Sequence, residues 1–309
     1  MKIIEDPKIF RPLVEEAIKR YGFAPEHNLA WWLAYVDKTQ KPVVAYWEET
    51  GEIELAHKSD KDWYTFSEPL VKAENRGQHV AELVEFVLKN YPDVEKVVTE
   101  AQEDTRQQII ESLPEHLMVI DHTEDGENNY ILTWPIMNME KFDPALPGGH
   151  FKYLRNARNK FYREHKVEMK EASQVSKKDL CGVVDRWAAG AGNREVELVH
   201  EQPFYNLIET GFNGLTTARA MIINDQVVGF NAGWEIPNSK NFYAGIGIHD
   251  YSVPDLGLML YLEDLEWMKK AGYPMADMGG IEEGNPLKFK NQFQPESWYN
   301  TYVFTIVRK

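Results

Sequence analysis

Apolar residues recur along the first half of the chain with two different spacings. In some segments they return every three to four residues, as on the buried face of an amphipathic helix, and in others they form short runs between turn residues, as in strands. The expected helices are 7–21, 77–88 and 104–113, and the expected strands are 29–36, 42–48, 53–57, 94–99 and 130–134. The pattern predicts an antiparallel meander followed by helix, strand, helix and strand.

The second half repeats this order of elements without evident sequence identity to the first. A tight turn at Asn224-Asp225-Gln226 separates two of its strands, and the amphipathic helix stops near Gly272. The expected helices are 151–166, 177–189, 204–210 and 258–268, and the expected strands are 216–223, 227–235, 241–248, a short parallel one at 275–278, and 298–307. Two α+β domains of similar topology follow from this repetition.

Proline and glycine gather between the halves, with Pro135, Pro144 and Pro147 followed by Gly148 and Gly149. Such residues are typical of connecting segments. We therefore expect an N-terminal domain at 1–134, a linker at 135–149 and a C-terminal domain at 150–309, with the active site in the latter.

Composition narrows the class of protein. No apolar run approaches the length of about 20 residues that a membrane-spanning helix needs, and the first ten residues lack the apolar core of a secretory signal, so we expect a cytoplasmic protein without membrane insertion. The single cysteine, Cys181, excludes an intramolecular disulfide, and no cluster of His, Asp or Glu has the spacing of a metal site. The net charge of −15 argues against nonspecific nucleic-acid binding over the whole surface.

A basic segment stands out against this acidic background. Residues 151–170 hold seven Lys or Arg and two Glu, a local charge of +5 on a predicted helix. Arg155 and Lys160 are expected to bind an anionic ligand there. Arg158 falls on the apolar side of the helix, where its guanidinium needs either a buried carboxylate or a substrate.

The second half resembles the catalytic C-terminal domain of lysyl-phosphatidylglycerol synthases. The resemblance covers most of residues 130–305 and rests on four places: Tyr130, the segment 148–161, Asp255-Leu256-Gly257, and Asp277-Met278-Gly279-Gly280 with the following 287–290. It implies two GNAT-like acyltransferase domains in tandem, each a mixed, mostly antiparallel sheet flanked by helices, similar to Fem-type aminoacyltransferases. The N-terminal half matches only in element order and size.

Three residues are candidates for catalysis. Asp277 ends an apolar strand, so its carboxylate either lines a cleft as a general base or hydrogen-bonds the turn at Gly279-Gly280. Lys288 and Lys290 would share one face in an extended segment but would point about 160° apart in a helix. Lys288 is expected to stabilise an oxyanion, and His249 is a second candidate base.

The resemblance implies transfer of an acyl group, often an aminoacyl group from a charged tRNA, to an amine or hydroxyl. Coenzyme A-dependent relatives present a Gln/Arg-x-x-Gly-x-Gly/Ala turn to the pyrophosphate. Here Gly257 supplies the middle glycine and is a binding candidate with Gly279, Gly280 and Lys290, but Pro254 and Met259 replace the flanking residues. This departure favours aminoacyl-tRNA over acyl-CoA as donor.

Several functions stay open at the level of sequence. The acceptor is a small molecule or a lipid headgroup, and the tRNA acceptor end is a possible partner. The alternatives are an acyl-CoA-dependent N-acyltransferase and a non-catalytic scaffold that binds an anionic ligand. An enzyme requires its base and its cations to converge, so the catalytic hypothesis predicts that Asp277, Lys288 and Arg158 line a common cavity.

Overall fold

The computed structural model describes residues 1–120, 129–191, 200–281 and 285–309. Its first half contains the predicted elements in order, except that 29–36 is not a strand, and it adds three short strands at 2–4, 62–65 and 117–120 that were not predicted. The elements are β1 (Lys2–Ile4), α1 (Pro7–Tyr21), α2 (Leu29–Ala34), β2 (Lys41–Trp47), β3 (Glu52–Lys58), β4 (Asp62–Thr65), the short 3-10 helix η1 (Ala73–Asn75), α3 (Arg76–Asn90), β5 (Lys96–Gln102), α4 (Glu103–Ser112), β6 (Leu117–Ile120) and β7 (Tyr130–Asn138).

The second half begins with the basic helix. Its elements are α5 (Lys152–Glu164), β8 (Val167–Glu171), η2 (Ala172–Gln174), α6 (Lys177–Ala191), α7 (Gln202–Glu209), β9 (Thr217–Ile223), β10 (Gln226–Glu235), β11 (Phe242–His249), α8 (Leu256–Ala271), β12 (Met275–Asp277), α9 (Asn285–Asn291) and β13 (Ser297–Arg308). The amphipathic helix ends as predicted, because Gly272 adopts a left-handed φ of 86° that suits glycine.

The described strands join in one mixed sheet that runs through both halves. Their order is β1-β2-β3-β4-β5-β13-β7-β12-β11-β10-β9-β8, with β6 pairing β13 beside this path. Most neighbours are antiparallel, while β4 with β5 and β11 with β12 are parallel, the latter as predicted. The α+β class and the tandem arrangement of two similar units are confirmed.

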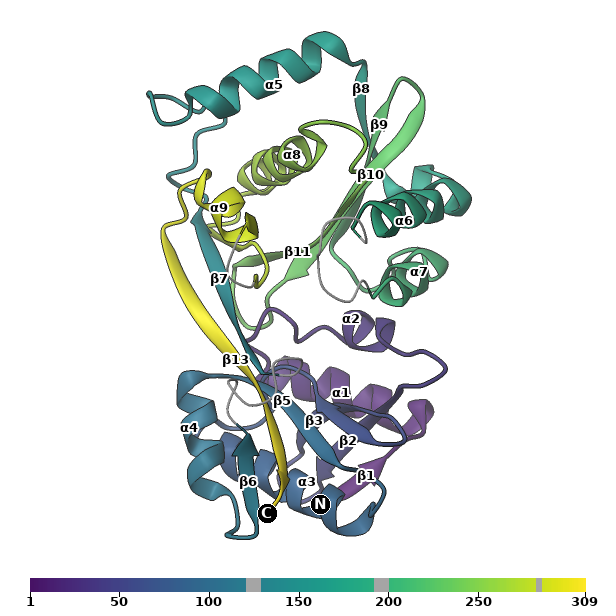
Figure 1. Cartoon of the computed structure of the whole chain (residues 1–309), viewed down its shortest axis with the longest axis vertical. Coiled ribbons are helices and arrows are strands. Elements are labelled where there is room, and N and C mark those ends of the chain that lie inside the picture. Colours follow the sequence, from purple (N-terminus) through teal and green to yellow (C-terminus); the bar gives the residue numbers. More distant parts are fainter. Residues whose placement is uncertain (121–128, 192–199, 282–284) are drawn as a thin grey trace.

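The two halves exchange strands at the centre of this sheet. β7, which closes the first half in sequence, pairs with β12 of the second. β13, the last strand, pairs with β7 through its first residues and with β5 and β6 of the first half through its last ones. In Figure 1 β13 runs in yellow from the upper half down into the lower one. The last strand of the chain therefore completes the N-terminal sheet.

The hydrophobic core also crosses between the halves. One buried cluster joins Phe10 and Trp32 of the first half to Leu207, Phe230 and Trp234 of the second. A second cluster lies between α5, α8 and the sheet, and a third holds α3 and α4 on the first half of the sheet. The aromatic residues Trp31, Trp32, Trp47 and Trp63 belong to these cores, as the sequence suggested.

The prediction of a strand at 29–36 is wrong. The segment LAWWLA forms the helix α2, which the side chain of Asn28 caps by accepting a hydrogen bond from Trp31 N at 3.0 Å. A six-residue apolar run without alternation suits a buried helix as well as a strand. Packing decides between them here, since Trp31 lies against Phe204 and Trp234 of the second half.

The expected linker begins inside a strand. β7 continues to Asn138, so the first four residues of 135–149 belong to the sheet, including Pro135 and Ile136 opposite Trp298 and Ser297. The division into 1–134 and 150–309 remains a prediction.

Candidate functional site

The basic helix α5 lies at one end of the molecule, with α8 between it and the sheet (Figure 1). Its two half-buried arginines bind the protein itself. Arg155 donates hydrogen bonds to Leu146 O and Gly148 O of the preceding loop. Arg158 donates to Pro144 O at 2.6 Å and to the Glu266 carboxylate at 3.2 Å. Arg158 thus takes the structural alternative, while Lys160 is exposed to solvent.

The beginning of α8 is filled by a histidine. A Cβ atom at Gly257 would lie 2.8 Å from the His249 ring, so a larger residue here would displace the ring. The ring of His249 therefore covers the first turn of α8, where a coenzyme A pyrophosphate would be expected. His249 also lies six residues beyond Tyr243, which pairs with Asp277, a separation of about 20 Å along the strand.

Asp277 lies at the centre of the shared sheet, with 2% of its surface exposed. Its Oδ1 accepts a hydrogen bond from Gly279 N at 3.0 Å, and its Oδ2 accepts one from Tyr299 OH at 2.7 Å. Gly279 has a φ of 83°, which only glycine adopts readily. Gly280 packs so closely that a Cβ there would be 2.6 Å from the Trp134 ring. The hydrogen bond expected between Asp277 and the glycine turn is present.

The two lysines of α9 separate as a helix requires. Lys290 turns inward and donates to Met278 O at 2.6 Å and Gly279 O at 2.7 Å, whereas Lys288 is exposed. The two-lysine clamp of an extended segment therefore does not form. Arg158 and Asp277 bind different partners, and none of Asp277, Lys288 and Arg158 lines either of the two cavities described below, so the predicted common cavity is not found there. Of the predicted cations, Lys290 is the one beside Asp277.

The first half contributes two carboxyl groups to the same place. Glu26, between α1 and α2, and Glu100, on β5, line a cavity of about 10 Å³, together with Trp134, Tyr299 and Thr301. This is room for about one water molecule. Thr301 Oγ1 donates to Glu100 at 2.5 Å and accepts from Trp134 Nε1 at 2.8 Å. Trp134 in turn stacks on Tyr299 at 5.7 Å.

We call these groups the junction site, since they come from both halves. It consists of Glu26, Glu100, Asp277, Lys290 and Tyr299. Glu26, Glu100 and Tyr299 line the same cavity, Tyr299 OH donates to Asp277, and the charges of Glu100 and Asp277 both raise the pKa of Glu26. Lys290 acts on Asp277, and Tyr299 joins Asp277 to the cavity that Glu26 and Glu100 line.

Burial dominates the ionisation of the junction site. It raises the pKa of Asp277 to about 6, against the opposing hydrogen bonds from Tyr299 and Gly279. It likewise raises the pKa of Glu100 to about 7 and that of Glu26 well above its usual range. Burial lowers the pKa of Lys290 to about 8, although Asp277 opposes this. Proton transfer near neutral pH is therefore accessible to the site.

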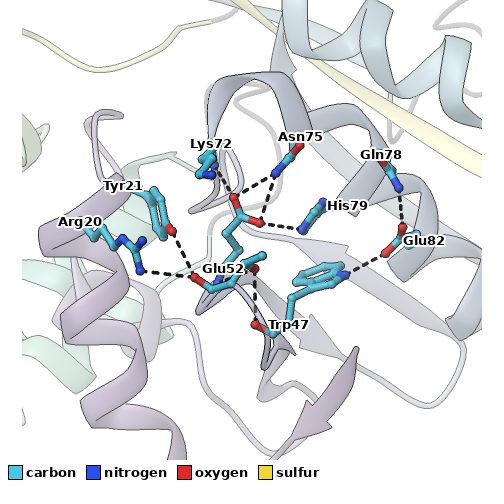
Figure 2. A network of polar contacts seen from close by, with 10 residues as sticks. Arg20, Tyr21, Trp47, Glu52, Lys72, Asn75, Gln78, His79 and Glu82 are labelled. Atoms are coloured by element: carbon cyan, nitrogen blue, oxygen red, sulfur yellow. Dashed lines mark hydrogen bonds and ion pairs between the residues drawn. The ribbon is translucent and has the colours of Figure 1, made fainter.

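In the first half, the loop before α3 corresponds to the start of α8. This loop binds a carboxylate of the protein itself. Figure 2 shows Glu52 at the beginning of β3, where its carboxylate accepts hydrogen bonds from Lys72 N and Asn75 and lies 3.0 Å from His79 Nε2. Burial would raise the pKa of Glu52, but these hydrogen bonds outweigh it and hold the pKa below its ordinary value. The loop before α3 is thus already bound to the protein's own carboxylate.

Sequence reasoning missed Glu26, Glu100 and Tyr299. Glu26 lies in a loop, and Glu100 and Tyr299 lie on strands β5 and β13, in which apolar and polar residues are mixed. A glutamate directly after Val97, Val98 and Thr99 in a predicted buried strand was the one available signal, similar to that of Asp277.

Two further features bear on function. No group of three or more His, Cys, Asp or Glu side chains in the described ranges is arranged to hold a metal ion. The helices of those ranges include none with the length and apolarity to cross a membrane.

Comparison with solved structures supports the tandem fold. L-PGS from Bacillus licheniformis matches with a TM-score of 0.64 at 14% identity over 99% of this chain and 92% of that one. A tandem GNAT protein from the clavulanic acid biosynthesis pathway matches with a TM-score of 0.58 at 10% identity, over 99% and 98% of the two chains. FemX matches with a TM-score of 0.61 at 9% identity, over 98% and 97%. At these identities the likeness shows the fold alone.

Sequence comparison reaches the family level. Among curated proteins, none matches the chain significantly. The sequence pattern of the family described as "Phosphatidylglycerol lysyltransferase, C-terminal" matches residues 24–283, a span that includes Glu26, Glu100 and Asp277. The chain therefore belongs to the family of the phosphatidylglycerol lysyltransferase C-terminal domain.

Proposed function

We propose that this protein transfers an aminoacyl group from an activated ester, such as aminoacyl-tRNA, to an amine or hydroxyl acceptor at the junction site. The observation that carries the proposal is the cavity lined by Glu26, Glu100 and Tyr299, whose hydroxyl donates to Asp277, with Lys290 beside Asp277. Clustered buried carboxyl groups are costly unless a cation compensates them. The ammonium group of an aminoacyl donor is such a cation, and it has about the size of the cavity.

The reaction assigns a role to each side of the site. The acceptor attacks the ester carbonyl, a new C–N or C–O bond forms, and the ester C–O bond to the donor breaks. Ionised Asp277 takes the proton of the acceptor, and the departing hydroxyl of the donor is protonated in turn. Lys290 uses two of its three N–H groups on Met278 O and Gly279 O, which leaves one for the developing oxyanion.

Two observations support an ester donor other than acyl-CoA. The His249 ring covers the first turn of α8, and Glu52 occupies the loop before α3. Both helix starts that would hold a pyrophosphate are thus engaged by side chains of the protein. The exposed cations of α5, among them Lys160, offer phosphate contacts for a tRNA acceptor end.

The test is transfer of radiolabelled lysine from lysyl-tRNA to phosphatidylglycerol vesicles and to soluble amines. We expect transfer from lysyl-tRNA, loss of transfer when the lysyl amino groups are acetylated, and a fall of about 100-fold or more in Asp277→Asn. Glu26→Gln should raise KM more than it lowers kcat, and the exposed Glu95→Gln serves as the matched control.

The other outcomes decide between the alternatives. Transfer from an acyl-CoA but not from lysyl-tRNA would replace the donor and favour an N-acyltransferase. No transfer with any donor, together with unchanged binding of anions in Asp277→Asn, would favour a non-catalytic scaffold.

A further inference from the structure

Glu26 lies on a thin segment, 23–28, that separates two hollows. Ala24, Pro25 and Glu26 line the junction cavity. His27 and Asn28 instead line a surface cleft of about 330 Å³ between α1, the start of α2 and the end of β10. Because residues 24–26 face the junction cavity and the next two residues face the cleft, a shift of this segment toward the cleft would withdraw Glu26 from Glu100.

His27 holds this segment with both ring nitrogens. Its Nδ1 accepts hydrogen bonds from Phe23 N at 3.0 Å and Ala24 N at 3.2 Å, and its Nε2 lies 2.7 Å from Glu68 O. Since Nδ1 accepts, the proton must be on Nε2, which donates to the Glu68 carbonyl. The side chain is 1% exposed. His27 therefore connects the end of segment 23–28 to its beginning, and the whole segment to Glu68.

Glu68 carries the connection on to the strand of Glu100. Its carboxylate accepts hydrogen bonds from Gln102 N at 2.6 Å and from Thr105 Oγ1 at 2.7 Å, at the end of β5 and the start of α4. The chain of contacts thus runs from the Glu26 segment through His27 and Glu68 to β5. These contacts therefore connect segment 23–28, which carries Glu26, to β5, which carries Glu100.

We propose that His27 is a positioning residue that fixes Glu26 opposite Glu100 in the junction site. This inference rests on the proposed function for its meaning, but its test does not require activity. The neutral ring is maintained because burial lowers the pKa of His27 to about 4, and the nearby Arg76 acts in the same direction, while the hydrogen bond to Glu68 O opposes them.

The ionisation of Glu26 provides the readout. Trp31 lowers the pKa of Glu26 against the effect of burial, although its Nε1 makes no hydrogen bond within the described residues, so the indole is near enough to sense the charge of that carboxyl group. We would incorporate 5-fluorotryptophan, assign the Trp31 resonance by Trp31→Phe, and follow its ¹⁹F shift with pH. Glu26→Gln should abolish the titration that Trp31 reports, and its persistence would contradict the placement of Glu26.

Two substitutions of His27 separate its contacts. His27→Asn keeps an acceptor for Phe23 N and Ala24 N but does not reach Glu68 O, whereas the longer His27→Gln retains a donor for that carbonyl. We expect the midpoint to fall toward the ordinary glutamate value in His27→Asn, because Glu26 gains water, and to return toward the wild-type value in His27→Gln.

The matched control is His57. It is 3% exposed, its Nε2 lies 3.0 Å from Trp32 O, and burial lowers its pKa to about 4, but it does not contact segment 23–28. His57→Asn should leave the midpoint in place. An equal shift in both Asn variants, or no shift in His27→Asn, would overturn the proposal.

Hydrogen exchange of the wild-type protein tests the same contacts and does not depend on whether the variants fold. The amides of Phe23 and Ala24 should be protected from hydrogen exchange, since both donate to His27 Nδ1. Exchange as fast as in a free loop would equally overturn the proposal. Neither result depends on lysyl transfer, so failure of the transfer assay and failure of this inference remain distinguishable.

Discussion

Ionisation of Asp277 should lower the free energy of unfolding as the pH rises. The variant Asp277→Asn, which cannot ionise, should not show this decrease. The carboxyl group is almost fully buried, and its pKa in the folded protein is about 6, compared with an ordinary value of 3.8. Between these values the folded state holds a proton that the unfolded state has released. Stability therefore falls as the pH rises through this window, and it is level above the folded pKa.

The magnitude follows from the width of the window. The difference between 3.8 and about 6 corresponds to roughly 3 kcal/mol in the free energy of unfolding. Asp277→Asn cannot ionise, so this contribution is absent. The stability of Asp277→Asn relative to the wild type should thus increase by roughly 3 kcal/mol from about pH 3.5 to about pH 7. A constant offset for altered hydrogen bonds to Tyr299 and Gly279 does not affect this change.

Asp250 gives a control of opposite sign. It is 5% exposed, but hydrogen bonds from Ser252 and Arg186 outweigh the effect of burial and hold its pKa below the ordinary value. Its stabilisation is present above pH 3.8 and is lost as the pH falls through the folded pKa. Asp250→Asn should therefore be less stable than the wild type at neutral pH, and the difference should shrink on acidification.

Urea unfolding followed by circular dichroism at several pH values measures both differences. The reasoning is refuted if the difference between Asp277→Asn and wild type does not change with pH, or if both variants change in the same direction. Either result would mean that Asp277 is solvated or fully compensated in the folded protein.

Three further outcomes are expected. Lys290→Ala should lower the free energy of unfolding by about 1.5–3 kcal/mol because it removes charged hydrogen bonds to two carbonyls, whereas Lys288→Ala should leave it unchanged in urea titrations; equal effects would contradict the helix α9. Arg158→Ala should cost about 1–3 kcal/mol by unpairing Glu266, and Arg158→Lys should recover part of this; a stable Arg158→Ala with weakened anion binding would restore its substrate role. Deleting residues 303–309 should expose the amides of β5 to hydrogen exchange, and retained protection there would show that the first half folds without β13.

Local pattern was sufficient for most elements of the fold. Pro7–Tyr21 forms the helix that its spacing predicts, and Met275–Asp277 forms the short parallel strand. The basic helix begins and ends close to the expected residues. The family resemblance, which rested on a few short motifs in the second half, is confirmed by the match to residues 24–283. These features depend on neighbours within a few positions, which periodicity reports directly.

The sequence also identified two of the five residues of the junction site. Asp277 and Lys290 were found because a charged residue in an apolar strand, or beside one, needs a partner. It did not identify which lysine faces inward, since that depends on whether 287–290 is extended or helical. It also left open whether Arg158 pairs with a carboxylate of the protein or binds a substrate. The hydrogen bonds to Glu266 and Pro144 O in the structure show the first of these.

Tertiary structure alone decided how the halves meet. α2 is a helix because it packs on the second half, and β13 crosses back to β5, more than 190 positions earlier in the chain. That crossing brings Glu100 and Glu26 to Asp277. By itself the sequence determined the elements and the family, because local spacing fixes which face of each element is apolar. It could not determine the site, because burial and electrostatic coupling arise between residues that only the folded sheet brings together.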